Sequence, residues 1–99
     1  MVDEFRARRD LLIAGLNELP GVSCRTPRGA FYAFPNVASL PIGAESLATR
    51  LLEDAGVAVL AGSAFGAAGT GHLRLSYANS RANLVTALER IRTLISTLD

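Results

Sequence analysis

The stretch GHLRLSYANS, residues 71–80, places an arginine inside a segment that otherwise alternates like a half-buried strand. Its two leucines and its tyrosine share one face, and Arg74 and Ser76 share the other. A guanidinium stays charged at every pH that a cell reaches, so Arg74 must face water or an anion. The segment therefore predicts a strand that carries one fixed positive charge on its outer face.

Working outward from this strand, seven segments have the pattern of a regular element. Helices are expected at 2–19, at 44–55 and after Ser80, whose side chain should cap the last of them, and strands at 22–25, 30–34, 57–60 and 72–77. The order α-β-β-α-β-β-α predicts an α+β domain of two layers. Its helices should pack on a small mixed or antiparallel sheet.

The apolar spacing also predicts which helical positions face inward. They are Val2, Phe5, Leu12, Leu16 and Leu19 in the first helix, Leu47, Leu51, Leu52 and Ala55 in the second, and Leu84, Leu88, Ile91, Ile95 and Leu98 in the third. Pro20-Gly21 and Gly56 should end the first two helices. The first helix has no capping residue before it, so we expect the chain to continue a longer polypeptide.

Composition points to a partner. The chain has 99 residues, enough for one domain, and is 49% apolar but only 19% charged. Because a small domain exposes much of its surface, this excess predicts that another domain or subunit covers part of it. A net charge of +1 without a basic stripe argues against nucleic acid and anionic membranes as partners. No segment has the pattern of a signal peptide or a membrane span.

The glycine-rich loop AGSAFGAAGTG, residues 61–71, has three interpretations. It could cradle a phosphate, connect two strands flexibly, or close over the mouth of a cleft. A phosphate loop normally leads from a strand into a helix, whereas this loop leads into a strand, and the chain contains no lysine. The phosphate interpretation is therefore the least favoured.

Other chemistry-bearing residues have plain structural interpretations. His72 is the only histidine and Cys24 the only cysteine, so we expect no zinc site and no internal disulfide, and the latter fits a reducing cytoplasm. His72 should end a strand, and Cys24 should lie in the core. Asp10, Glu53 and Asp54 fall on expected helix surfaces as solvated charges.

Arg74 has two interpretations. It could form a salt bridge on an exposed sheet face, which residue physics by itself favours. Alternatively, its planar fork could bind a carboxylate through two parallel hydrogen bonds, with the strand holding the fork rigidly. Composition and spacing do not decide between the two.

Three linked segments carry a family resemblance. PRGAFYAFPNV (27–37), LLEDAGVAVLAGSAFG (51–66) and GHLRLSYANSRANLVTALERI (71–91) resemble the C-terminal small domain of class I/II aminotransferases. These are fold-type I pyridoxal-phosphate enzymes, and the chain most resembles their bacterial aspartate aminotransferase group. The resemblance extends over nearly all of residues 1–99 in the right order, so it implies that the whole chain is this small domain.

The resemblance also implies roles for particular residues. In the family, the arginine of the matching strand binds the α-carboxylate of the amino-acid or keto-acid substrate, and here that residue is Arg74. Two further family segments lie near the substrate cleft. The residues that would shape the cleft here are Gly29, Phe31, Tyr32, Ser63 and Phe65.

One departure limits what the chain can do alone. The family's catalytic lysine forms a Schiff base with pyridoxal phosphate, and this chain has no lysine. The family's other cofactor-binding residues lie in a large domain, which is absent here. The resemblance therefore implies an enzyme that moves an amino group between α-amino and α-keto acids, homodimeric and cytoplasmic. We expect the 99 residues by themselves to bind no cofactor and to be inactive.

A different class of function stays open. A chain of this length and element order could be a stand-alone small-molecule-binding, regulatory or interaction module. Arg74 would then hold the carboxylate of an effector without any chemistry.

Overall fold

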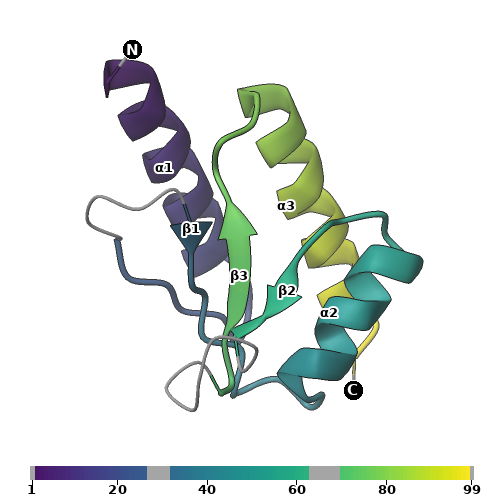
Figure 1. The fold of residues 1–99 in the computed structure, drawn as a ribbon. Coiled ribbons are helices and arrows are strands. Elements are labelled where there is room, and N and C mark those ends of the chain that lie inside the picture. Colours follow the sequence, from purple (N-terminus) through teal and green to yellow (C-terminus); the bar gives the residue numbers. More distant parts are fainter. Residues whose placement is uncertain (1, 27–31, 63–69, 99) are drawn as a thin grey trace.

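The computed structural model describes residues 2–26, 32–62 and 70–98, which form a small α+β domain (Figure 1). The elements are α1 (Val2–Asn17), β1 (Tyr32–Ala33), α2 (Ala44–Glu53), β2 (Leu60–Ala61), β3 (Leu73–Ser76) and α3 (Arg81–Ser96). The predicted fold class is confirmed, with the helices packed on a small sheet. Figure 1 shows α1 and α3 running in the same direction, with α2 beside β2.

The sheet of the described residues is antiparallel throughout, in the order β1-β3-β2. The GHLRLSYANS segment therefore supplies the central strand. Ala33 of β1 lies opposite Leu75, and Ala61 of β2 lies opposite Leu73. All four residues belong to the hydrophobic core or pack against it, so this register defines the inner face of the sheet.

Two predicted strands differ from the structure. Residues 22–25 form no strand, and only Ser23 makes an isolated bridge, to Asn36. The strand expected at 57–60 begins only at Leu60. The observed order among the described residues is therefore α-β-α-β-β-α. The apolar character of both segments reflects burial, because Val22, Cys24, Val57 and Val59 are buried without joining a ladder.

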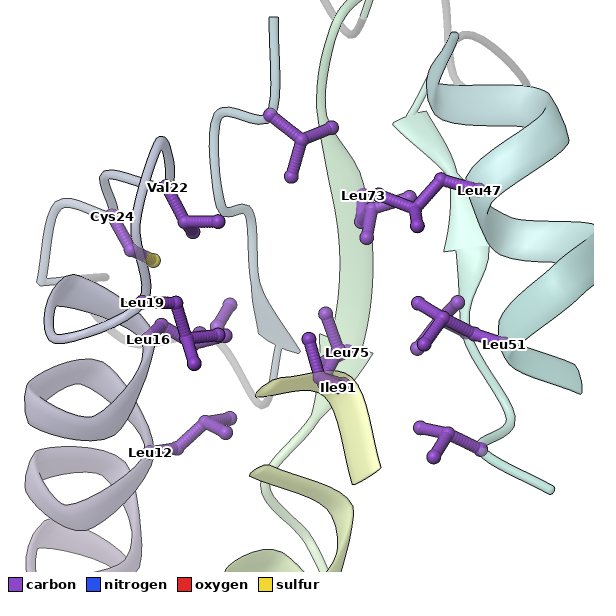
Figure 2. Packing of buried hydrophobic residues seen from close by; sticks show 14 of the residues in the cluster. Leu12, Leu16, Leu19, Val22, Cys24, Leu47, Leu51, Leu73, Leu75 and Ile91 are labelled. Atoms are coloured by element: carbon purple, nitrogen blue, oxygen red, sulfur yellow. The ribbon is translucent and has the colours of Figure 1, made fainter. Parts of the chain in front are cut away.

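The core is one cluster to which all three helices and the sheet contribute (Figure 2). Figure 2 shows the leucines of α1 and of the turn after it facing those of β3 and α2 across this core. Such burial is the main favourable term in folding, about 25 cal/mol for each Å² of apolar surface removed from water. The largest side chains with almost no exposure are Leu12, Leu16, Leu47, Leu51, Leu73, Val37 and Pro35.

Most of the predicted inward positions are confirmed, but two are wrong. Leu52 is 57% exposed and Phe5 is 37% exposed. In α2 the buried side chains are Leu47, Ala48 and Leu51, so Leu52 lies beyond the edge of the buried stripe. Phe5 lies in the first turns of α1, ahead of the buried Leu12, and its ring centroid lies 5.8 Å from Cζ of Arg8. The side chain of Val2, also predicted to face inward, lies outside the described part of the chain. The third helix follows the prediction, although Leu88 and Leu98 are only partly buried.

The predicted helix ends are close to the observed ones. The Ser80 hydroxyl accepts a hydrogen bond from the backbone N–H of Asn83 at 3.1 Å, as a capping serine should. After α2, Gly56 adopts φ of +70°, where a side chain would be strained. The Val57 N–H then donates to the Leu51 carbonyl at 2.8 Å, which turns the chain back toward β2.

Asn17, the last residue of α1, binds the segment 22–25 through its side chain. Its side-chain amide donates to the carbonyls of Ile13 and Cys24, at 3.0 and 2.9 Å. Its side-chain oxygen accepts from the N–H of Cys24 at 2.9 Å. Both backbone groups of Cys24 are therefore bonded to one side chain rather than to a neighbouring strand, and the segment is fixed to the helix.

Replacing Asn17 by alanine should lower the free energy of unfolding by about 1–3 kcal/mol, because both partly buried backbone groups of Cys24 lose their partner. Urea denaturation of the 99-residue chain measures this. Asn83→Ala is the matched control, since that amide bonds to Asn79 on an exposed helix surface and should change stability by less than about 0.5 kcal/mol. Equal losses in the two variants would contradict the role of Asn17.

A second link joins the N-terminal ends of α1 and α3. The Arg81 guanidinium donates to both carboxylate oxygens of Glu4, at 3.1 and 2.8 Å, and Arg8 donates to the same carboxylate at 3.0 Å. These hydrogen bonds from Arg81 and Arg8 lower the pKa of Glu4. Because both side chains are exposed, the Glu4–Arg81 pair adds little to the stability of two helices that the core already holds together.

Candidate functional site

Arg74 lies in the central strand with its side chain on the outer face of the sheet. Its strand neighbours Leu73 and Leu75 are buried, whereas Arg74 is half-buried, which confirms the predicted alternation. The register places Leu60 of β2 directly across from Arg74. On the other side, Tyr32 of β1 lies opposite Ser76, so Tyr32 is the diagonal neighbour of Arg74 on the same face.

The guanidinium contacts an aromatic ring. Cζ of Arg74 lies over the ring of Tyr32, 4.2 Å from its centroid. Beside this pair is a hollow of about 290 Å³ lined by Tyr32, Leu52, Ala58, Val59, Leu60, Arg74 and Ser76. Arg74 is the only one of these lining residues that carries a charge.

The surroundings of Arg74 are unusually apolar for an exposed surface. Three of the large apolar residues that the described chain exposes line this hollow: Tyr32 at 36%, Leu52 at 57% and Leu60 at 49%. Apolar groups gathered on a surface mark a face that something else covers. Once covered, a cation in such a place interacts strongly with an anion, because little water remains to screen the two charges. The geometry suits a carboxylate held between this face and a covering surface.

The other predicted site residues divide into two groups. Tyr32 lies beside Arg74, so the structure brings these two together. Gly29, Phe31, Ser63 and Phe65 lie outside the described residues, as does most of the glycine-rich loop. The residues that the sequence interpretation missed are Leu52 and Leu60, the first because it was assigned to the core and the second because the register was unknown.

Cys24 and His72 line a different hollow, of about 580 Å³, together with Phe34 and Asn36. Cys24 is buried as predicted, and burial raises the pKa of its thiol. His72 forms an isolated bridge with Asn36 next to the start of β3, and its ring Nδ1 lies 3.0 Å from the Thr70 carbonyl oxygen. A thiol kept protonated by burial is a poor nucleophile, so this hollow offers no evident chemistry.

The three carboxylates that were predicted to be solvated, Asp10, Glu53 and Asp54, are exposed. Asp10 pairs with Arg9 at 3.0 Å and Asp54 with Arg50 at 3.5 Å, all at the surface. Within residues 2–26, 32–62 and 70–98, no three metal-ligating side chains come together.

A larger hollow of about 590 Å³ between the end of α2 and α3 contains none of the predicted site residues. None of the helices in the described part of the chain is long and apolar enough to cross a membrane.

The sequence of this chain matches one family of known proteins. The family described as aminotransferase class I and II matches residues 1–91. An aspartate aminotransferase of Pyrococcus horikoshii is 41% identical over 91 residues, which is 92% of this chain and 23% of the relative.

Solved structures agree with the sequence match. The aspartate aminotransferase of Rhizobium meliloti superposes with a TM-score of 0.89 at 41% identity, over 98% of this chain and 26% of that one. An alanine aminotransferase of Pyrococcus furiosus gives a TM-score of 0.90 at 33% identity, over 95% of this chain and 24% of that one.

The chain belongs to the class I and II aminotransferase family. It spans about a quarter of the length of the relatives that it matches. The family resemblance seen in the sequence is therefore confirmed.

Proposed function

We propose that the chain is the C-terminal small domain of a pyridoxal-phosphate aminotransferase of the aspartate aminotransferase type. The parent enzyme would transfer an amino group between an α-amino acid and an α-keto acid. The observation that carries this proposal is the placement of Arg74, a cation on a central strand, on an outer sheet face bordered by exposed apolar side chains.

In this proposal Arg74 binds the α-carboxylate of the substrate. The guanidinium offers two parallel N–H donors whose spacing matches that of carboxylate oxygens. A central strand, paired on both sides, holds the base of this side chain with little freedom. Holding one end of the substrate in a fixed orientation favours the reaction as well as binding, because the reacting atoms then start close to their productive geometry.

The 99 residues do not fit the cofactor by themselves. Pyridoxal phosphate is held through a lysine amine, and the chain has no lysine. We therefore assign to this chain only a substrate contact and one wall of the site, and we expect it to be inactive when isolated. The rest of the site would come from a large domain, which accounts for the three quarters of the relatives' length that this chain does not span.

The proposed contact does not select the substrate side chain. Similar proteins are named for aspartate, alanine and aromatic substrates, yet all such substrates share the α-carboxylate. An arginine that binds this shared group would serve each of them equally. We propose that residues of the large domain select the substrate side chain. Separately, we expect the parent enzyme to be a cytoplasmic homodimer, as the family resemblance implies.

Calorimetry on the isolated chain separates the proposal from the alternative of a stand-alone module. We expect no measurable binding of free amino or keto acids at millimolar concentration, because most of the proposed site is missing. Circular dichroism must first show that the isolated chain is folded. Micromolar binding of a free amino or keto acid would favour the module, as would a native polypeptide with an intact mass near 10.4 kDa.

A further inference from the structure

The contact between Arg74 and Tyr32 is built by the sheet. Both side chains project from the outer face, Arg74 from β3 and Tyr32 from β1. Tyr32 pairs directly with Ser76, two residues beyond Arg74, which makes the tyrosine a diagonal neighbour within reach of a long side chain. The register of the sheet thus brings the ring to the guanidinium, and the observed distance of 4.2 Å from Cζ to the ring centroid is well inside the range of a cation–π contact.

This contact engages the arginine in a way that suits a carboxylate-binding residue. The ring interacts with the delocalised charge over the guanidinium carbon and takes no N–H donor from the fork. An acidic neighbour would instead compete with a substrate for the same donors. The neighbours that the register places around Arg74 on this face are Leu60 and Phe34 directly opposite and Tyr32 diagonally, and none of them carries a carboxylate.

A long arginine side chain needs such support. It has several rotatable bonds, and the hollow beside it is otherwise lined by short or aliphatic residues such as Ala58, Leu60 and Ser76. These residues offer packing to the aliphatic part of the side chain. The Tyr32 ring is a rigid surface fixed by the β1–β3 pairing, so it limits the guanidinium to fewer orientations before a substrate arrives.

We propose that Tyr32 is a positioning residue, whose ring holds the Arg74 guanidinium ready for the substrate carboxylate. This inference rests on the proposed function of Arg74 and gives Tyr32 a definite role in it. The ring acts through Arg74 alone, and its hydroxyl is not required. Amino-acid and keto-acid substrates should depend on it equally, because both carry the α-carboxylate.

The test uses the full-length enzyme that contains this chain. Tyr32→Leu, which removes the ring but keeps an apolar side chain, should lower kcat/KM about 3- to 30-fold for both the amino acid and the keto acid. Tyr32→Phe keeps the ring and should stay within about 2-fold of the parent. Phe5→Leu is the matched control, since it also removes an exposed aromatic ring that lies over an arginine, here Arg8 of α1, but does not line the Arg74 hollow, and it should leave kcat/KM within about 2-fold.

A double-mutant cycle tests whether the loss of kcat/KM in Tyr32→Leu depends on Arg74. In an Arg74→Leu background, adding Tyr32→Leu should cause no further loss of kcat/KM, because the residue through which the ring acts is gone. A purely structural role would instead lower the melting temperature and add its loss in both backgrounds.

The outcomes separate the two proposals. If Arg74→Leu lowers kcat/KM strongly but Tyr32→Leu does not, or does so additively, the positioning role is wrong and the function of Arg74 stands. A loss in Tyr32→Phe as large as that in Tyr32→Leu also overturns the role, because the hydroxyl would then be the active group. If Arg74→Leu has no effect, the proposed function itself fails.

Discussion

Replacing Arg74 by leucine in the full-length enzyme should lower kcat/KM for amino acids between about 30-fold and several thousand-fold. The change removes a fork of two charge-assisted hydrogen bonds and leaves the substrate carboxylate against Tyr32, Leu60 and Leu52. A carboxylate that loses its partner in such an apolar setting is strongly disfavoured. Steady-state kinetics with an amino acid and its keto acid measure the loss, which should appear for both.

Two further variants sharpen this result. Arg74→Lys keeps the charge but loses the planar fork, so its activity should lie between those of the parent and the leucine variant. Arg92→Leu is the control, because Arg92 is an exposed arginine of α3 that lies 3.9 Å from Glu18. It should leave kcat/KM within about 2-fold, as exposed surface substitutions away from a site usually do. An unchanged kcat/KM in Arg74→Leu would show that the strand arginine is not the carboxylate clamp.

Replacing Leu51 by alanine should lower the free energy of unfolding of the chain by about 2–5 kcal/mol. Leu51 has no exposed surface, and it belongs to the cluster in which α2 meets β3 and Ile91 of α3 (Figure 2). The loss combines the transfer of apolar surface with the cavity that remains, because the surrounding strand and helices relax only in part. For a domain of this size, that is a large share of the total stability, and urea denaturation of the chain measures it.

Leu52→Ala provides a control that differs by one position. Leu52 follows Leu51 in the same helix but is 57% exposed, so its truncation should cost no more than about 0.5 kcal/mol in the isolated chain. Similar losses at the two positions would mean that α2 packs on a different face from the one described. In the full-length enzyme the cost at Leu52 should increase if a covering domain buries the Arg74 hollow.

The helices and their ends follow from local rules, and the sequence predicts them well. Ser80 offers the hydroxyl that a helix start needs, and Gly56 takes the positive φ after α2 that other residues avoid. The alternation around Arg74 likewise identifies β3 and its two faces. These signals depend on residues within a few positions of one another, so no tertiary information is needed to interpret them.

The strands outside β3 were harder to predict, because an apolar run shows burial but not its hydrogen-bond partner. The backbone groups of Cys24 bond to the side chain of Asn17, seven residues away, rather than to another strand. Val57 and Val59 are buried ahead of β2, yet the ladder begins only at Leu60. A short apolar run fits a strand and a buried extended segment equally well.

The candidate site, too, has features that the sequence determines and features that only the tertiary structure determines. The sequence by itself determined the family, the α+β class and the presence of one fixed positive charge on the outer face of a strand, because these depend on motifs and on the period of two along a strand. Only the tertiary structure decided that Tyr32 lies against Arg74 and that Leu52 and Leu60 border it. Tyr32 and Leu60 are placed by the register of three antiparallel strands, and Leu52 is placed by the packing of α2 beside β2, neither of which a local pattern encodes.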